Sequence, residues 1–305
     1  MADAFRPVDV TRVHGRARAA ASDRAATEEP LEVRLHGRPF AVIMRTPGAD
    51  RELAAGFLLA ERVLRSADDL GTIEYCTERL GPAEAGPYVC AEAGPDCTDT
   101  DGPPEGGPHV RQAPDANIVN VTLAHGSADT VDRFLADRRQ VMTNSSCGLC
   151  GRLTIESLRS EAPPLDCDWT IDHTTLASLP DRLRASQGVF DETGGLHAAG
   201  LFTPDGTLEA VAEDVGRHNA VDKVIGRMLM QERLPLSRSL LFVSGRTSFE
   251  IVQKALLAGV PIVASVSAPS TLAIDLARES GVTLAGFVRG DRFNIYAHPD
   301  RIAVR

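Results

Sequence analysis

The chain has 305 residues, of which 43% are hydrophobic, and a formal net charge of −10 at pH 7. This size and composition indicate a soluble globular protein with enough apolar residues for one large domain or two modest ones. The negative charge excludes a general nucleic-acid-binding protein, because such a protein needs a basic surface that neutralises phosphates. A single local pocket for an anion is still compatible with this charge.

The sequence contains no run of 18 apolar residues and no N-terminal export signal. We therefore expect neither a membrane-spanning helix nor export, and we expect the protein to work in the cytoplasm. In that compartment the six cysteines are expected to be reduced thiols rather than disulfides.

The first residues predict a disordered arm followed by a hairpin. Residues 1–29 are rich in Ala, Arg and Asp and have no periodic apolar pattern, so we expect them to be disordered. Alternating apolar residues then predict two strands, over 31–35 and 40–44, with a turn at His36-Gly37-Arg38-Pro39 between them. The folded part of the chain is therefore expected to begin near Leu31.

The remainder of this N-terminal unit, residues 30–142, predicts an α+β subdomain. Asp50 is expected to cap a helix that ends near Leu64. Further strands are expected over 73–80 and 117–123, and a helix over 128–138. A Gly/Pro-rich insertion over 81–115 interrupts the unit, since residues 81–108 alone contain 12 Gly or Pro. Such a segment cannot pack and is expected to be poorly ordered.

Two cysteines lie in a run of small polar residues and glycines, Thr143-Asn144-Ser145-Ser146-Cys147-Gly148-Leu149-Cys150-Gly151. This run has almost nothing to bury, so we expect residues 143–152 to form a mobile loop between an N-terminal and a C-terminal unit. Cys147 and Cys150 can share one incoming atom, because a tight turn brings both thiols to the same point. From spacing alone that atom could be a metal ion, a disulfide partner or a sulfane sulfur.

The C-terminal unit, residues 153–305, predicts strands that alternate with helices. Strands are expected over 197–203, 207–212, 240–243, 262–266, 284–288 and 292–296, and helices over 218–233, 249–258 and from Ser270 or Thr271 to Glu279. This order is typical of an α/β fold with a mixed sheet, helices on its faces and parallel strands where a helix intervenes. Ligands of such sheets bind beyond the carboxyl ends of the strands, against helix N-termini.

Three polar segments follow strand ends and are therefore candidate binding segments. The first is Glu213-Asp214-Val215-Gly216-Arg217-His218-Asn219-Ala220-Val221-Asp222-Lys223, which is far more polar than a surface helix start requires. The second, Ser244-Gly245-Arg246-Thr247-Ser248, offers backbone amides and a guanidinium to an anion. The third, Phe287-Val288-Arg289-Gly290-Asp291-Arg292-Phe293-Asn294, is a tight turn with two arginines beside aromatic rings, and its alternative interpretation is an ordinary hairpin turn.

Lys223 and Lys254 are the only lysines of a chain that otherwise uses arginine. One interpretation is that each marks a place where a compact ammonium is needed instead of a planar guanidinium. The other is that both are solvated helix lysines without a special role.

Together these segments resemble the formate dehydrogenase accessory sulfurtransferase family, FdhD. The resemblance is carried by Ser145 to Gly151, by Glu213 to Lys223, by Ser244-Gly245-Arg246 and by Phe287 to Arg292. It covers the chain from about Leu31 to the C-terminus and leaves out the arm and the insertion. The segment from Glu213 to Lys223 is highly specific, whereas the two-cysteine pattern alone is weak.

The resemblance implies a sulfurtransferase. Members of the family carry sulfur from a cysteine desulfurase to a molybdenum or tungsten bis-guanine-dinucleotide pterin cofactor, which then enters formate dehydrogenase. In this chain Cys147 would hold the persulfide, and Cys150 would either relay the sulfur or resolve the persulfide. The cofactor would be bound as a substrate, with no permanently bound metal, and the family suggests a homodimer.

The candidate cofactor-binding residues follow from the same match. Phe287, Val288, Arg289, Gly290, Asp291 and Arg292 would contact the guanine nucleotides, and Arg217, His218, Lys223, Ser244, Gly245 and Arg246 complete the set. Each pyrophosphate needs cationic partners, for which Arg217, Arg246, Arg289 and Arg292 are suited. Phe287 or Phe293 could stack on guanine. Lys223 could supply a point charge near the phosphates or the metal oxo groups.

The family is also similar in fold to cytidine deaminases, so the C-terminal unit is expected to be deaminase-like and a zinc deaminase is a rival function. That enzyme needs His-x-Glu at one helix start and Pro-Cys-x-x-Cys at the next. Here His218-Asn219-Ala220 and Ser244-Gly245-Arg246-Thr247 stand in these places, and His197-Ala198-Ala199 also lacks the glutamate. Deamination is therefore not expected.

Three further alternatives stay open. The cysteine pair could be half of a structural zinc site that a dimer completes, or a thioredoxin-like redox motif. The whole protein could instead be a non-catalytic chaperone that binds and escorts the cofactor without carrying sulfur.

Overall fold

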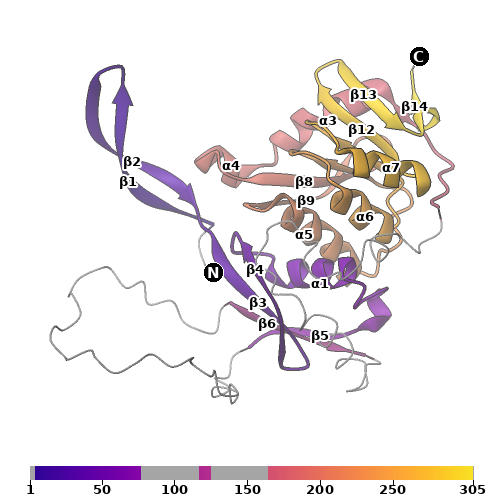
Figure 1. Ribbon diagram of the computed structural model, residues 1–305, viewed down its shortest axis with the longest axis horizontal. Coiled ribbons are helices and arrows are strands. Elements are labelled where there is room, and N and C mark those ends of the chain that lie inside the picture. Colours follow the sequence, from indigo (N-terminus) through magenta and orange to yellow (C-terminus); the bar gives the residue numbers. More distant parts are fainter. Residues whose placement is uncertain (1–3, 77–116, 125–163, 305) are drawn as a thin grey trace, which may run out of the picture.

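The computed structural model describes residues 4–76, 117–124 and 164–304 of the chain. Its elements are arranged in layers: a four-stranded sheet, a layer of helices, a six-stranded sheet and a further helix on the outer face of that sheet (Figure 1). The predictions made for Cys147 and Cys150, for the insertion 81–115 and for the helix 128–138 lie outside the described residues.

The six-stranded sheet has the order β13-β12-β11-β10-β8-β9. Its strands are β8 (His197–Phe202), β9 (Leu208–Asp214), β10 (Leu240–Val243), β11 (Ile262–Ser265), β12 (Thr283–Arg289) and β13 (Arg292–Ala297). β10, β11 and β12 run parallel, whereas β13 and β8 are antiparallel to their neighbours. The predicted mixed α/β sheet is confirmed, and the narrower likeness to deaminases stays a prediction.

Helices cover both faces of this sheet because its central strands are apolar on both faces. In β10, Leu241 and Val243 join one hydrophobic cluster, whereas Leu240 and Phe242 join another, as the two-residue period of a strand requires. The first cluster includes residues of α5 (Arg217–Met230), α6 (Phe249–Leu257) and α7 (Thr271–Glu279). The second includes the leucines of α3 (His173–Arg184).

The N-terminal part contributes the four-stranded sheet, with the order β4-β3-β6-β5, and helix α1 (Asp50–Ala60). Its strands are β3 (Glu29–Leu35), β4 (Arg38–Arg45), β5 (Leu70–Tyr75) and β6 (Ile118–Leu123). The predicted hairpin over 31–44 is thus confirmed. Leu31 and Val33 belong to the same hydrophobic cluster as α5, so one continuous core joins the N-terminal and C-terminal elements.

Helices α1 and α5 approach each other through two glycines. A Cβ built on Gly56 would lie 2.0 Å from the carbonyl oxygen of Asp222, and one on Gly226 would lie 1.9 Å from that of Glu52. No side chain fits at such distances, so glycine is required at both positions for the two backbones to come this close.

Asp50 is not the N-cap of α1, and the prediction of that role is wrong. The N-cap is Ala49, which has the left-handed backbone conformation (φ 54°) and makes no side-chain cap. Asp50 is the first residue of the helix, and its carboxylate pairs with Arg45 instead. The carboxylate of Asp50 therefore binds the buried guanidinium of Arg45 and does not accept a hydrogen bond from the backbone at the start of the helix.

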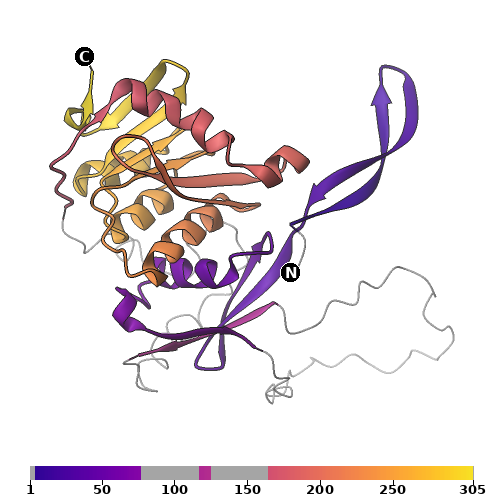
Figure 2. The same ribbon diagram turned by 180° about the vertical axis from the view of Figure 1, so that it is seen from behind.

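The prediction of a disordered arm over residues 1–29 is wrong for the residues that form a hairpin. β1 (Phe5–His14) and β2 (Ala17–Ala26) pair along their whole length as an antiparallel ribbon. Both views show this ribbon extending away from the rest of the molecule (Figure 2). Most of its side chains are exposed, which explains why its strands lack the apolar alternation that marks a half-buried strand.

Several elements were not predicted. They are α3, the short helix α4 (Gly188–Thr193), the parallel pair β7 (Ile171–Asp172) and β14 (Ile302–Ala303), and two short 3-10 turns at Ala67–Asp69 and Pro299–Arg301. Asp172 caps α3 by accepting a hydrogen bond from the Thr174 amide. Of the helices in the described part of the chain, none is long and apolar enough to cross a membrane.

Candidate functional site

The carboxyl ends of four strands meet at one edge of the six-stranded sheet. β9, β10, β11 and β12 all end there, and the antiparallel strand β8 begins there, since His197 pairs with Asp214 at the end of β9. All three polar segments singled out from the sequence therefore lie along this edge, which is where ligands of α/β sheets bind.

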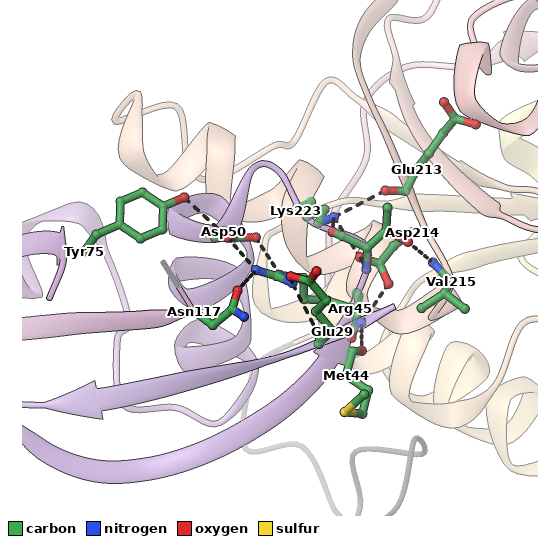
Figure 3. A network of polar contacts seen from close by, with 12 residues as sticks. Glu29, Met44, Arg45, Asp50, Tyr75, Asn117, Glu213, Asp214, Val215 and Lys223 are labelled. Carbon is green, nitrogen blue, oxygen red and sulfur yellow. Dashed lines mark hydrogen bonds and ion pairs between the residues drawn. The ribbon is translucent and has the colours of Figure 1, made fainter. Parts of the chain in front are cut away.

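The first segment, Glu213 to Lys223, mainly makes polar contacts that hold the C-terminal elements against the N-terminal ones; we call these contacts the joint. The ammonium of Lys223 lies 2.7 Å from Asp214 Oδ2 and donates to the carbonyl oxygen of Thr46 at 2.8 Å. Asp214 also accepts from the backbone amide of Thr46 at 3.1 Å and from Asn219 Nδ2 at 2.8 Å. Figure 3 shows Lys223 between Asp214 and the carbonyl of Glu213.

The prediction that Lys223 supplies a charge to phosphates or metal oxo groups is wrong. Its side chain is almost fully buried, and its three donors are directed to Asp214, Thr46 and Glu213. No donor is left for a ligand, so this lysine has a structural role.

A second buried ion pair lies beside this joint (Figure 3). Arg45 donates to both carboxylate oxygens of Asp50, at 2.9 and 3.0 Å, and to Asn117 Oδ1 at 2.8 Å. The hydroxyl of Tyr75 lies 3.4 Å from the same carboxylate. Burial, together with the negative charge of Asp50, raises the pKa of Tyr75. These contacts connect β4, β5 and α1, so they stabilise the N-terminal elements.

The other face of α5 pairs with α6. His218 Nε2 lies 2.9 Å from Glu250 Oε2 and 2.9 Å from Ser248 Oγ. One turn further, Lys254 donates to both oxygens of Asp222, at 2.6 and 2.8 Å. Burial raises the pKa of Asp222 despite the opposing charge of Lys254. Lys254 is therefore a buried partner of Asp222, not a solvated helix lysine.

The second segment, Ser244 to Ser248, forms the turn that follows β10. Ser244 Oγ accepts a hydrogen bond from the Ala198 amide, and the side chain of Arg246 is exposed at the sheet edge. Gly245 packs against His197, since a Cβ at Gly245 would lie 3.3 Å from His197 Nδ1. The side chain of Arg217 lies beside it, and its buried Nε has no hydrogen-bond partner among the described residues. Both Arg217 and Arg246 thus retain unused guanidinium donors at this edge.

The third segment surrounds the turn between β12 and β13. The guanidinium of Arg289 lies 5.8 Å from the centre of the Phe287 ring, and its Nε donates to the carbonyl oxygen of Val266 at 3.0 Å. Phe287 is exposed, as are Gly290, Asp291 and Arg292. The side chain of Val288 is instead fully buried in the core, so only its backbone is left for the predicted contact with the guanine nucleotides.

A cavity of about 610 Å³ opens at the same edge of the sheet. Its lining comes from α3, α4 and the loop before β8 on one side and from the ends of β10 and β11 on the other. Ser244 and Val266 line it, so the cavity adjoins both the second polar segment and the backbone that holds Arg289. Of the three predicted segments, the second lines the cavity through Ser244, and the third reaches its edge through the hydrogen bond of Arg289 to Val266.

His197 lines this cavity and was not among the predicted site residues. It was noticed in the sequence only as an incomplete deaminase motif. Burial is the main cause that lowers the pKa of its imidazole, and the positive charges of Arg217 and His218 add to the effect. The neutral imidazole is therefore favoured at pH 7, a form that can both donate and accept a hydrogen bond.

Within the described ranges, no three His, Cys, Asp or Glu side chains are grouped so that they could hold a metal ion. Cys147 and Cys150 lie outside those ranges, so their proposed roles rest on sequence. Of the described cysteines, Cys76 and Cys167 are free thiols with partly buried side chains.

A family model described as FdhD/NarQ matches residues 26–303. The sulfur carrier protein FdhD of Streptomyces avermitilis is 49% identical over 304 residues, which cover 97% of this chain and 95% of that protein. The protein of the same name from Mycobacterium tuberculosis is 45% identical over 280 residues, covering 91% of each chain.

One solved structure has the same fold. It is the crystal structure of a Desulfotalea psychrophila protein described as a formate dehydrogenase accessory protein. The TM-score is 0.70 at 24% sequence identity, and the match covers 99% of this chain and 100% of the other. At this level of identity the comparison shows that the two chains share a fold.

Proposed function

Because this chain belongs to the FdhD/NarQ family, we propose that it is a sulfur carrier in the maturation of formate dehydrogenase. It would accept sulfur from a cysteine desulfurase as a persulfide on Cys147 and pass it to a molybdenum bis(molybdopterin guanine dinucleotide) cofactor, bound as a substrate. The names of its relatives support the carrier role, since those proteins are called sulfur carriers.

In the first step, the Cys147 thiolate attacks the terminal sulfur of the desulfurase persulfide. The S–S bond of the donor breaks, an S–S bond to Cys147 forms, and the donor cysteine leaves as a thiolate, so no external electrons are needed. Thiolate attack requires an accessible cysteine that can approach another protein. The glycines at 148 and 151 leave little side-chain bulk beside the thiols.

The second step delivers the sulfur. If Cys150 resolves the persulfide, its thiol attacks Cys147 Sγ, a Cys147–Cys150 disulfide forms and hydrosulfide leaves. With one proton, the hydrosulfide replaces an oxo ligand of the substrate metal, and that oxygen leaves as water. In this step Cys147 and Cys150 are oxidised by two electrons to the disulfide, while the transferred sulfur is reduced to hydrosulfide. A dithiol reductant must reduce the disulfide before the next cycle.

The observation that carries the binding half of this proposal is the convergence of polar segments at one sheet edge. Arg217 and Arg246 keep unused guanidinium donors beside a cavity of about 610 Å³, and Arg289 lies against the backbone that lines it. Guanidinium groups bind phosphate through paired hydrogen bonds. The edge therefore suits a ligand that carries pyrophosphate and a nucleobase.

Sulfur loading tests the proposal. After incubation with a cysteine desulfurase and cysteine, intact-protein mass spectrometry should show the gain of one sulfur atom, removable by dithiothreitol. Cys147→Ala should gain none, whereas Cys167→Ala, which removes a partly buried free thiol in the described part of the chain, should load normally. Equal loading of Cys147→Ala and the unchanged protein would show that Cys147 is not the carrier.

Activation of formate dehydrogenase in cells that lack their own accessory protein separates the carrier from the chaperone. A sulfur carrier loses activation when Cys147 is replaced by Ala, whereas a chaperone that only escorts the cofactor keeps it. Comparing Cys150→Ala in the same cells assigns the second thiol a necessary or a dispensable role. The homodimer and the cytoplasmic location stay predictions.

A further inference from the structure

Three polar side chains meet where the N-terminal ends of α5 and α6 approach each other. His218 Nε2 lies 2.9 Å from Glu250 Oε2 and 2.9 Å from Ser248 Oγ. His218 and Glu250 are buried, at 7% and 5% exposed, whereas Ser248 is partly exposed. The three side chains thus connect the interior of the protein with the sheet edge where the polar segments lie.

Helix α6 does not account for the position of the Ser248 side chain. Ser248 is the N-cap residue of α6, yet its hydroxyl accepts no hydrogen bond from the helix backbone. A serine at this position normally stabilises a helix by accepting such a bond. Here the hydroxyl is directed to His218 instead, so the contact with the imidazole replaces the usual role of the cap.

The His218–Glu250 pair is suited to hold one proton. Glu250 Oε1 has no hydrogen-bond partner among the described residues, so within that part of the chain the carboxylate relies on His218 for a balancing charge. A buried carboxylate without a cation is costly. The proton that the imidazole and the carboxylate share is therefore retained while the pair stays buried.

The other charged or titratable groups near His218 come from α5, α6 and β8. They are Arg217, Asp222 with its partner Lys254, and His197. Lys254 neutralises Asp222 through two hydrogen bonds. His197 is favoured in its neutral form, because burial lowers its pKa. Glu250 is thus the group that balances the charge of the His218 imidazolium.

Ser248 extends this pair to the sheet edge. It belongs to the second polar segment and follows the exposed Arg246 by two residues. A hydroxyl group accepts one hydrogen bond while it donates another. Ser248 can therefore take a proton from His218 and give its own hydrogen to a group bound at the edge.

We propose that Ser248, His218 and Glu250 form a proton relay for the transfer of sulfur to the cofactor. The inference rests on the proposed function, in which one proton is needed when an oxo ligand of the substrate metal leaves as water. Ser248 is the residue that contacts the substrate. His218 supplies the proton, and Glu250 positions His218 and balances its charge.

The step balances without a change of oxidation state. The Nε2–H bond of His218 breaks, Ser248 Oγ takes this proton, and the hydrogen that Ser248 carried goes to the oxo ligand. Hydrosulfide gives that oxygen its second hydrogen, the sulfur binds the metal, and water leaves. His218 is then neutral and regains a proton from water through the same hydroxyl.

Activation of formate dehydrogenase in cells that lack their own accessory protein tests the relay. Ser248→Ala removes the hydroxyl but no helix cap, so the protein should fold, and a desulfurase should still load Cys147. Activation should fall roughly 100-fold, within the range that general acid–base catalysis contributes. Ser248→Thr keeps a hydroxyl and should retain most activation. Ser22→Ala, on the exposed ribbon, should activate as the unchanged protein does.

The dehydrogenase purified from the same cells separates proton transfer from cofactor binding. With Ser248→Ala it should contain as much molybdenum as with the unchanged protein but little cyanide-labile sulfur. The accessory protein itself should accumulate sulfur on Cys147, since loading continues and delivery does not. His218→Gln should give the same results. A dehydrogenase without molybdenum would mean that Ser248 serves cofactor binding, and the relay would be wrong.

Full activation by folded Ser248→Ala or His218→Gln overturns the relay, and so does the loss of sulfur loading in either variant. Circular dichroism identifies a His218→Gln protein that does not fold, and Ser248→Ala then decides alone. Activation that is lost with Cys147→Ala and kept with Ser248→Ala rejects the relay and keeps the carrier. Absence of sulfur on Cys147 of the unchanged protein rejects the carrier itself.

Discussion

The ammonium nitrogen of Lys223 lies 2.7 Å from Oδ2 of Asp214, and both side chains are almost fully buried. Lys223 and Asp214 bind the backbone of Thr46 from opposite sides, one at its carbonyl oxygen and one at its amide. Thr46, which directly follows β4, is thus fixed to the end of β9 and to the middle of α5. The polarity of the segment from Glu213 to Lys223 largely serves this joint.

Lys223→Met should destabilise the protein by about 3–5 kcal/mol, because it leaves the carboxylate of Asp214 buried without its cation. Urea unfolding followed by circular dichroism measures the loss. The double variant Lys223→Met with Asp214→Asn should lose less than the sum of the two single variants, since neither charge is then left alone. A Lys223→Met protein of unchanged stability and weakened GDP binding would instead place this lysine at the ligand.

The strands of the six-stranded sheet could be predicted from sequence because both faces of that sheet are covered. Leu240 to Val243 is a short apolar run bounded by polar residues, and β10 has these bounds. The cap of α7 was also predicted, and Ser270 Oγ accepts from the Ala273 amide. Both features depend on residues close together in the chain, which is why a single sequence carries them.

The remaining features depend on contacts between distant residues. The ribbon β1–β2 buries little, so its pairing leaves no apolar period to detect. Helix α3 does show leucines at helical spacing, at 176, 179 and 183, but Pro180 within it obscures the pattern. The ion pair of Lys254 with Asp222 becomes visible only when the elements are packed.

Gly56→Ala should be destabilising by about 1–3 kcal/mol or more, because its Cβ would lie 2.0 Å from a backbone oxygen of α5 and the helices must separate. Thermal or urea unfolding measures the loss. Gly188→Ala is the matched control, since a Cβ on that helical glycine meets nothing within 4 Å, and it should not destabilise. Equal effects of the two substitutions would mean that α1 and α5 are not in such close contact.

Removal of residues 2–26 should leave the core folded, because neither hydrophobic cluster contains a residue of the ribbon. A two-stranded hairpin adds little stability by itself. We expect the melting temperature to change by no more than about 2–4 °C, the shift that 1 kcal/mol gives in a domain of this size. Differential scanning calorimetry checks this, and loss of the cooperative transition would show that the core needs the ribbon.

His197→Gln should alter the dependence of stability on pH. Burial, Arg217 and His218 lower the pKa of His197 in the folded protein, whereas the unfolded chain keeps a value of about 6.5. As pH falls through about 6.5, the unfolded state therefore binds a proton before the folded state does, and the protein loses stability. Above that pH the imidazole is neutral in both states and the effect vanishes.

The variant lacks this proton uptake, so its stability relative to the unchanged protein should rise between pH 7.5 and 5.5. Urea unfolding at several pH values measures the difference, in which titration of all other groups cancels. His14→Gln, on the exposed ribbon, serves as the control and should follow the unchanged protein at each pH. A difference between His197→Gln and the unchanged protein that stays constant, or falls towards acid pH, would mean that the cavity does not disfavour the imidazolium.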